Sequence, residues 1–367
     1  MRFHELSLSE IDLCQADHNV QELGPSGTKV PWEEVMVKRF RRSAAGYDEQ
    51  LPSDIRPPAV LKRTLDYLMR DIVGGSESLS SVQKFVWDRT RGIRNDFSIQ
   101  QVTKIEDIRL AIECFERIAR YHILVLHQLS RSDLRDDDFD HYQEREQLNN
   151  TLLSLMYYYD DSRQRFSSPN EAEFRSYCII FEIQNSRPDL EDRIQNWPDS
   201  ILKDQRVQTA LEIHAAASTS SLAQGPLTPK TPFTIGQGNA SRFWNLLRSN
   251  ATSYLTACVA EMYFGFVRTF TIETIWKAYK AKRGGSSNVE DWTLKDLCSI
   301  LGFDGEVQTS EFCEDHGLQV VRTLSGELSV NLSSHSGATL SGKSNWDLPS
   351  DAHKIVRLQS STEAITL

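Results

Sequence analysis

The sequence lacks the features that define membrane, secreted and zinc-binding proteins. Its most apolar stretch, residues 255–267, is short and contains Glu261, whereas a membrane-spanning helix needs about 20 apolar residues, so we predict no membrane insertion. The six cysteines form no C-x-x-C pair, which argues against a zinc site and a disulfide framework and is typical of a reducing compartment. No apolar run follows Met1, so we predict no signal peptide and expect a soluble intracellular protein.

An excess of positive charge is also missing. Lysine and arginine number 41 against 51 aspartate and glutamate residues, so nucleic acid could be contacted only through a local basic patch. Residues 268–283 form such a patch, with Glu273 as their only acidic residue. The candidate nucleic-acid-binding residues are Arg268, Lys277, Lys280, Lys282 and Arg283. A solvated basic helix end fits this pattern equally well, and Trp276 and Tyr279 have the spacing of core residues.

Motifs for catalysis are scarce. The nine histidines assemble no ligand set, and H-E-x-x-H and G-x-S-x-G are absent. We therefore predict no catalytic, cofactor-binding or metal-binding residues, and a protein that is not an enzyme. His122 lies on an apolar stripe and is expected to be a core histidine. Residues 337–344 match G-x-x-x-x-G-K-[ST], but Pro349 follows too closely for the helix that a phosphate loop requires, which favours a chance match.

Helical periodicity is the strongest pattern that is present. Apolar residues recur at alternating steps of four and three from Ile108 to Leu129, and comparable stripes cover residues 60–68, 82–97 and 148–159. Long helices joined by short polar turns are typical of stacked antiparallel helix pairs. The sequence has no exact internal repeat. We therefore predict a mainly α fold with an irregular helical-repeat (TPR/PCI-like) stack.

Two helix starts can be placed within this stack. The glycine pair at 74–75 ends one helix, and Ser80 or Ser81 is expected to cap the next. Asn170 followed by Glu173 fits a capping box, in which the two side chains satisfy backbone N–H groups reciprocally.

The C-terminal part of the chain changes to shorter elements. Three short helices, one of them capped by Thr293, and a hairpin that turns at Gly326 are the plan of a C-terminal winged helix. Its apolar residues Trp292, Leu294 and Phe303 are candidates for either its core or a partner interface. The predicted divisions are an irregular segment 1–50, a helical stack 51–266 with a flexible loop at 214–238, a winged helix 267–330 and a polar, disordered tail 331–367.

One block of sequence carries a specific resemblance. Residues 85–97 read Phe-Val-Trp-Asp-Arg-Thr-Arg-Gly-Ile-Arg-Asn-Asp-Phe. Together with residues 51–58, 242–247 and the basic segment 37–46, this block resembles the SAC-three/GANP family of messenger-RNA export factors, over about residues 29 to 325. The signature residues are Trp87, Asp88, Arg89, Arg91, Arg94, Asp96 and Phe97. Their alternating charges fit either an internal ion-pair network or a binding site.

The resemblance implies a nuclear scaffold, with the nuclear envelope and the pore as candidate locations. Its implied partners are a PCI-domain subunit, a small acidic polypeptide of the Sem/DSS kind, and RNA or DNA without strong sequence preference. Nothing after Val330 resembles the helix with which larger members recruit centrin, so a centrin-type partner is not expected. The alternative is a sister assembly, in which such a protein joins a signalosome-related PCI complex that acts in transcription elongation and splicing.

Overall fold

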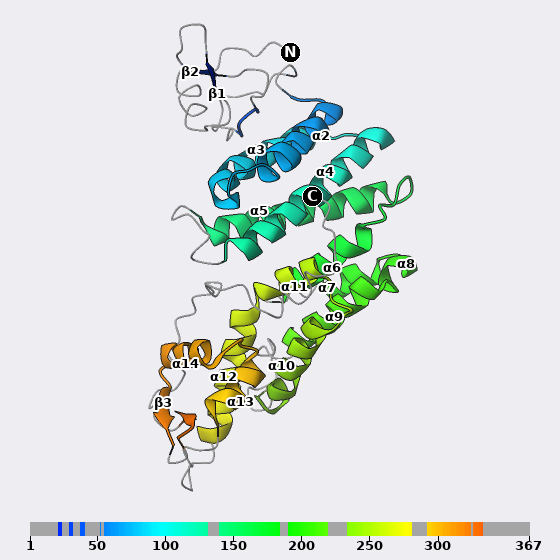
Figure 1. Ribbon diagram of the computed structural model, residues 1–367. Coiled ribbons are helices and arrows are strands. Elements are labelled where there is room, and N and C mark those ends of the chain that lie inside the picture. Colours follow the sequence, from blue (N-terminus) through cyan, green and yellow to red (C-terminus); the bar gives the residue numbers. More distant parts are fainter. Residues whose placement is uncertain are drawn as a thin grey trace, which may run out of the picture. The chain divides into compact units, whose positions relative to one another are not determined.

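Helices dominate this protein (Figure 1), as the periodicity predicted. The computed structural model describes residues 21–23, 29–31, 37–40, 52, 55–130, 139–183, 190–218, 233–280, 292–323 and 326–332. The elements are β1 (Gln21–Leu23), β2 (Lys29–Pro31), α2 (Pro58–Tyr67), the π-helix η4 (Leu68–Val73), α3 (Leu79–Gln100), α4 (Ile105–Gln128), α5 (His141–Ser162), α6 (Glu171–Phe181), α7 (Leu190–Gln195), α8 (Asp199–Leu202), α9 (Gln205–Ser218), α10 (Phe233–Arg248), α11 (Tyr254–Glu261), α12 (Phe264–Lys280), α13 (Leu294–Leu301), α14 (Glu306–Asp315), β3 (Gln319–Arg322) and β4 (Leu328–Asn331). Within these ranges, no helix combines the length and the apolar character that crossing a bilayer requires.

The chain divides into two compact units, and α4 contributes to both. The first unit comprises residues up to Ile118 and the short segment 136–139. Its core includes Leu65 of α2, Phe97 of α3 and Phe115 of α4, with the two phenylalanine rings 6.0 Å apart. Helix α2 begins at Pro58, where proline is favoured because its missing N–H would be unpaired in a first helical turn anyway.

The cap of α3 differs from the prediction by two or three residues. Ser78, rather than Ser80 or Ser81, has the extended backbone of an N-cap, and its side chain accepts a hydrogen bond from the Ser81 N–H. The two later serines already lie inside the helix. The glycine pair at 74–75 does end the preceding helix, as predicted, because η4 stops at Val73.

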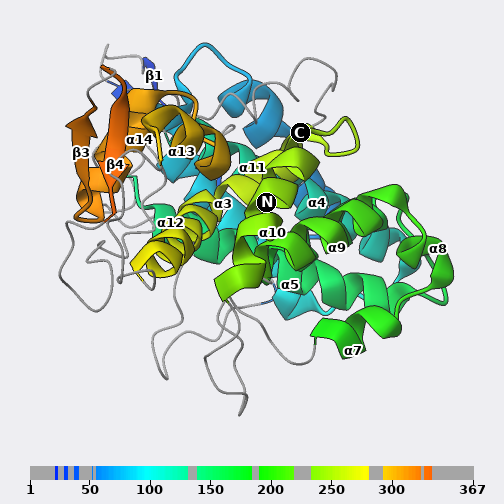
Figure 2. The ribbon, with the colours of Figure 1, turned by 90° about the horizontal axis from the view of Figure 1, so that it is seen from below.

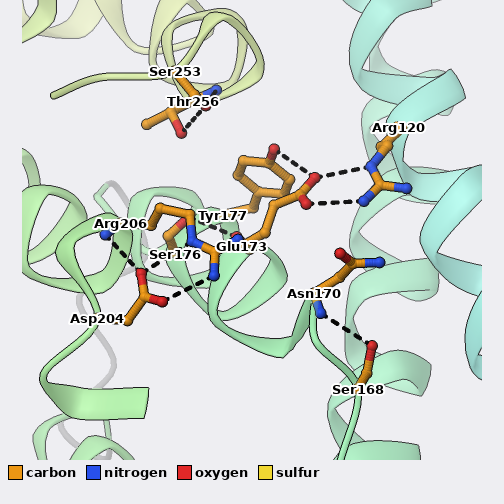
Figure 3. A network of polar contacts seen from close by, with 10 residues as sticks. All are labelled: Arg120, Ser168, Asn170, Glu173, Ser176, Tyr177, Asp204, Arg206, Ser253 and Thr256. Atoms are coloured by element: carbon orange, nitrogen blue, oxygen red, sulfur yellow. Dashed lines mark hydrogen bonds and ion pairs between the residues drawn. The ribbon is translucent and has the colours of Figure 1, made fainter. Parts of the chain in front are cut away.

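In the second unit, α6 packs against α5, α9 and α11, and Figure 3 shows the polar contacts of this region. The predicted capping box at its start is absent, because Asn170 makes no side-chain cap. Glu173 instead accepts two hydrogen bonds of 2.9 Å from Arg120 of α4 and one of 3.0 Å from the Tyr177 hydroxyl. A bidentate arginine–carboxylate pair is stronger than a neutral cap, which accounts for the difference.

Two buried histidine–glutamate pairs join helices of the same unit. His122 Nδ1 lies 2.5 Å from Glu144 of α5, and both side chains are fully buried. His127 Nδ1 lies 2.5 Å from Glu261 of α11. The prediction that His122 is a core histidine is therefore confirmed.

Helices α12, α13 and α14 and the hairpin β3–β4 share one apolar core, and we call these elements together the C-terminal module. Figure 2 labels each of them. Thr293 caps α13 through a hydrogen bond from the Asp296 N–H, and Gly326 has a positive φ of 86° in the hairpin turn. Both features were predicted. Strand β4 pairs with β3 and also meets residues 292–293, since the Val330 N–H donates to the Trp292 carbonyl at 3.1 Å. The buried core residues are Ile272, Ile275, Trp276, Leu294, Leu297, Leu301, Cys313, Leu318, Val330 and Leu332.

The loop predicted at 214–238 is helical at both ends. Helix α9 continues to Ser218, and α10 begins at Phe233. The alanines at 215–217 were assigned to the loop on composition, but alanine is the strongest helix former, which favours continuation of α9. The remainder of that loop, and the predicted tail beyond Leu332, lie outside the described residues.

Candidate functional site

The structure removes one residue from the predicted nucleic-acid patch. Arg268 is 2% exposed and lies inside the second unit. The backbone of α12 includes Lys277 and Lys280, but their side chains lie outside the described part of the chain. Lys282 and Arg283 are also outside it. The patch formed by these four residues therefore stays a prediction.

Arg268 connects two helices instead of facing solvent. Its Nε donates to the Leu301 carbonyl at 3.0 Å and its Nη2 to the Gly302 carbonyl at 2.8 Å, at the C-terminal end of α13. Its guanidinium carbon lies 3.8 Å from the centre of the Phe303 ring. Burial lowers the pKa of Arg268 to about 9. Its position four residues before the buried Ile272 is the sequence signal that marked it as a core position.

The three candidate interface residues of the C-terminal module separate into two groups. Leu294 is 1% exposed and belongs to the module's core, so it is unavailable to a partner. Trp292 and Phe303 are half-buried and pack against that core from outside. They remain candidates for an interface.

A short segment of the same chain packs against the signature block on α3. Residues 37–40, which we call the clasp, lie against the face of α3 that carries Asp88, Gly92 and Asp96. The Lys38 ammonium donates to Asp96 Oδ1 at 3.0 Å. At the other end of the clasp, the Phe40 N–H donates to Asp88 Oδ2 at 3.2 Å.

Asp96 is the centre of this arrangement. It is fully buried, and it also accepts hydrogen bonds from the Arg56 Nε at 2.8 Å and the Arg56 N–H at 3.3 Å. Gln100, one turn further along α3, donates to the carbonyls of Arg56 and Asp96 at 2.8 Å each. One buried carboxylate therefore holds both the clasp and Arg56, which lies two residues before α2.

Aromatic rings also lie at this face of α3, which carries Asp88, Arg91, Gly92 and Asp96 and which we call the signature face. The Arg91 guanidinium lies 4.0 Å from the centre of the Phe40 ring and 5.4 Å from that of Trp87. Arg89 is buried, contacts Asp88 at 2.5 Å and lies 4.5 Å from the Phe85 ring. Guanidinium groups are attracted to ring faces at such distances.

Two further signature residues have other surroundings. Phe97 is a core residue, and Arg94 is half-buried. The block is therefore an internal network, as one of the two predicted interpretations held, and its ion pairs join α3 to the clasp and to Arg56. Lys38, Phe40 and Arg56 were not predicted as site residues. The available signal was the basic cluster that begins at Lys38, since buried carboxylates on α3 require cationic partners.

The chemistry of this face is binding by charge pairs, a backbone hydrogen bond and ring contacts. Among the described residues, no group of three or more histidine, cysteine, aspartate or glutamate side chains could hold a metal ion. The sequence match at residues 337–344 lies outside the described part of the chain.

Comparison with known protein sequences identifies the family of this chain. The profile of the SAC3/GANP family matches residues 13–322, and the chain therefore belongs to that family, which confirms the resemblance inferred from the residues. Among its relatives, SAC3 family protein 1 of Schizosaccharomyces pombe (strain 972) is 40% identical over 314 residues, which are 85% of this chain and 29% of that protein. Protein xmas of Drosophila melanogaster is 28% identical over 311 residues, which are 82% of this chain and 13% of that protein. SAC3 family protein B of Arabidopsis thaliana is 26% identical over 284 residues, which are 73% of this chain and 15% of that protein. The chain thus spans less than a third of the length of these relatives.

Proposed function

We propose that this chain is the core of a non-enzymatic scaffold subunit of a nuclear complex that couples transcription to messenger-RNA export. The observation that carries the proposal is membership of the SAC3/GANP family over residues 13–322. The described chain supports it with a helical stack followed by the C-terminal module. A scaffold needs extended, rigid surface rather than a catalytic cleft, and stacked helices supply such surface.

The C-terminal module is proposed to be a winged helix that pairs with a PCI-domain subunit. Its order of three helices followed by a hairpin, with β4 also bridged to Thr293, supports this assignment. The half-buried Trp292 and Phe303 are the proposed contacts, because partly exposed aromatic residues are enriched at interfaces. The complex is further proposed to include a small acidic polypeptide and to contact RNA or DNA.

Identification of co-purifying proteins tests this function. A tagged chain, isolated from nuclear extract and analysed by mass spectrometry, is expected to retain a PCI-domain subunit in one-to-one amount. An untagged extract and a chain cut before α12 serve as controls, and the shortened chain is expected to lose the PCI subunit. Recovery of signalosome-related PCI subunits would favour the elongation and splicing assembly, and recovery of no PCI protein would contradict both. Microscopy of the same tagged chain tests the nuclear location and shows whether the chain is found at the nuclear pore.

The nucleic-acid surface needs a separate test in the partner-bound complex. Each phosphate contact contributes about 0.7 to 0.9 to the slope of log affinity on log salt, so replacing Lys277, Lys280, Lys282 and Arg283 by alanine is expected to flatten the slope by up to about three. Lys104→Ala, which removes one exposed lysine from the first unit, is expected to leave it unchanged. Fluorescence anisotropy over a salt series measures both. An unchanged slope in the folded fourfold variant assigns the binding to the partner subunit.

A further inference from the structure

We propose that the signature face of α3 is a receptor for an extended peptide in which a lysine lies two residues before an aromatic residue. Residues 38–40 of the same chain, Lys-Arg-Phe, are its resident ligand and bind as a detachable clasp. The inference concerns the first unit alone and does not depend on the proposed function.

The contacts of the clasp alternate as those of an extended peptide do. Lys38 and Phe40 both face α3, through the 3.0 Å ion pair with Asp96 and the 4.0 Å ring contact with Arg91. Arg39, between them, is exposed. Side chains two residues apart point to the same side of an extended chain, so the pattern is a Lys-x-Phe motif rather than a general attraction of basic residues.

The main chain of the clasp crosses α3 at Gly92. A Cβ atom at that position would lie 3.5 Å from the Lys38 carbonyl oxygen and 3.7 Å from the Phe40 nitrogen, which is van der Waals contact, so a methyl group fits there but a larger side chain would not. Lys38 contacts Asp96 and Phe40 contacts Asp88, so the clasp runs antiparallel to α3. Eight helical residues cover about 12 Å, which an extended tripeptide and a lysine side chain can span together.

The charges of the face select the ligand. Asp88 and Asp96 accept hydrogen bonds from the two ends of the clasp, and Asp96 is fully buried. A phosphate in the place of the Lys38 ammonium would lie against the buried Asp96 carboxylate, and like charges at such distances repel. At Asp96 the signature face therefore fits a lysine-bearing peptide.

A peptide added to the full chain tests whether the face is a receptor. The probe is a labelled peptide of residues 35–43, and the receptor is the Lys38→Ala/Phe40→Ala variant, whose α3 face is intact but whose clasp is weakened. A tethered ligand acts at an effective concentration of about millimolar. The variant is therefore expected to bind the probe at least about tenfold more tightly than the wild type, whose face is already occupied.

Charge-matched probes show whether the motif is read. A peptide with Lys38→Ala is expected to bind the variant at least about tenfold more weakly, because one ion pair to a buried carboxylate is lost. A peptide with Arg39→Ala loses the same charge and is expected to stay within about twofold. Equal binding by wild type and variant, or equal losses for the two peptides, would overturn the proposal.

Two measurements keep the test valid if the double variant does not fold. In the wild type, the Phe40 N–H is expected to exchange with solvent more slowly than an unprotected amide but at least about tenfold faster than the Ile93 N–H of α3, because the clasp opens locally. Exchange at the Ile93 rate, or at the unprotected rate, would contradict a detachable clasp. Gly92→Val is expected to speed Phe40 exchange about tenfold or more, whereas Gly92→Ala, whose added atom fits, leaves it within about twofold. Equal effects of both substitutions would also overturn it.

Discussion

Two regions of the molecule hold an arginine against aromatic rings, and they differ in how deeply the arginine is buried. On the signature face, Arg91 contacts the Phe40 ring in a half-buried cluster that also contains carboxylates. In the C-terminal module, Arg268 contacts the Phe303 ring and donates to the main-chain carbonyls of Leu301 and Gly302. Arg268 connects α12 to the C-terminal end of α13, so its loss should destabilise the second unit.

The largest expected effect follows from removing the buried arginine. Arg268→Ala leaves the Leu301 and Gly302 carbonyls without a donor and opens a cavity beside Phe303, which should lower the free energy of unfolding of the second unit by about 3 to 5 kcal/mol. Urea denaturation followed by tryptophan fluorescence measures the change. Arg248→Ala removes an exposed arginine from α10 and should have little effect. A loss below about 1 kcal/mol for Arg268→Ala would contradict the structural role given to Arg268 between α12 and α13.

Neutralising the centre of the signature face comes next. Asp96→Asn removes the carboxylate that pairs with Lys38 and Arg56, and it leaves the mostly buried Arg56 without its anion. We expect a loss of about 2 to 4 kcal/mol in the first unit, with faster exchange of the Phe40 N–H. Glu77→Gln, at an exposed position before α3, is the control and should change neither. Unchanged stability with unchanged exchange would contradict the account of the clasp.

A glycine beside Arg268 allows a test of packing in the same module. Gly302 has a φ of +67°, and a Cβ added there would lie 2.5 Å from Trp244 Cδ2, inside a buried ring contact. Gly302→Ala should therefore cost about 1 to 3 kcal/mol. Gly265→Ala, in α12, has no atom within 4 Å of the new Cβ and should stabilise the helix by about 0.5 to 1 kcal/mol. Thermal denaturation of both variants shows whether the effects have opposite signs, and a shared sign would refute this reading.

The sequence predicted local features well and long-range ones poorly. The Thr293 cap, the turn at Gly326 and the inward position of His122 depend on neighbours within a few residues or on helical period. The clasp depends on Lys38 meeting Asp96, 58 residues away, and no local pattern encodes that pairing. A network of charges was predicted for α3, but its contacts with the clasp were not.

Arg268 shows a different limit of sequence reasoning. It was grouped with the lysines of α12 because a charge count weighs residues by proximity along the chain. Helical phase instead places it on the face of the buried residues Thr271 and Ile272. The capping prediction at Asn170 failed for a related reason, since Glu173 has a stronger partner in Arg120, on another helix. Local preferences are overridden where tertiary contacts offer a charged partner.

The smallest expected effect separates the two regions by pH. Burial raises the pKa of Cys313, in the core of the C-terminal module, from 9.0 to about 12. A thiol kept neutral in the folded state stabilises it fully below the pKa of the unfolded chain, and this contribution is lost as pH rises from about 9 toward 12. The module should therefore lose up to about 1.4 kcal/mol per pH unit in that window from this group alone. The free energy of unfolding of Cys313→Ala should be lower than that of the wild type at pH 7 but approach it by pH 10. Val330→Ala opens a cavity in the same core without removing a titrating group, so its free energy of unfolding should stay below that of the wild type by the same amount at every pH. Parallel curves for both variants would show that the thiol does not couple folding to pH.

Phe40 exchange, corrected for the intrinsic effect of pH, tests the clasp in the same samples. The contacts described for the clasp involve carboxylate, lysine and arginine groups, so the Cys313→Ala substitution should leave that exchange unchanged.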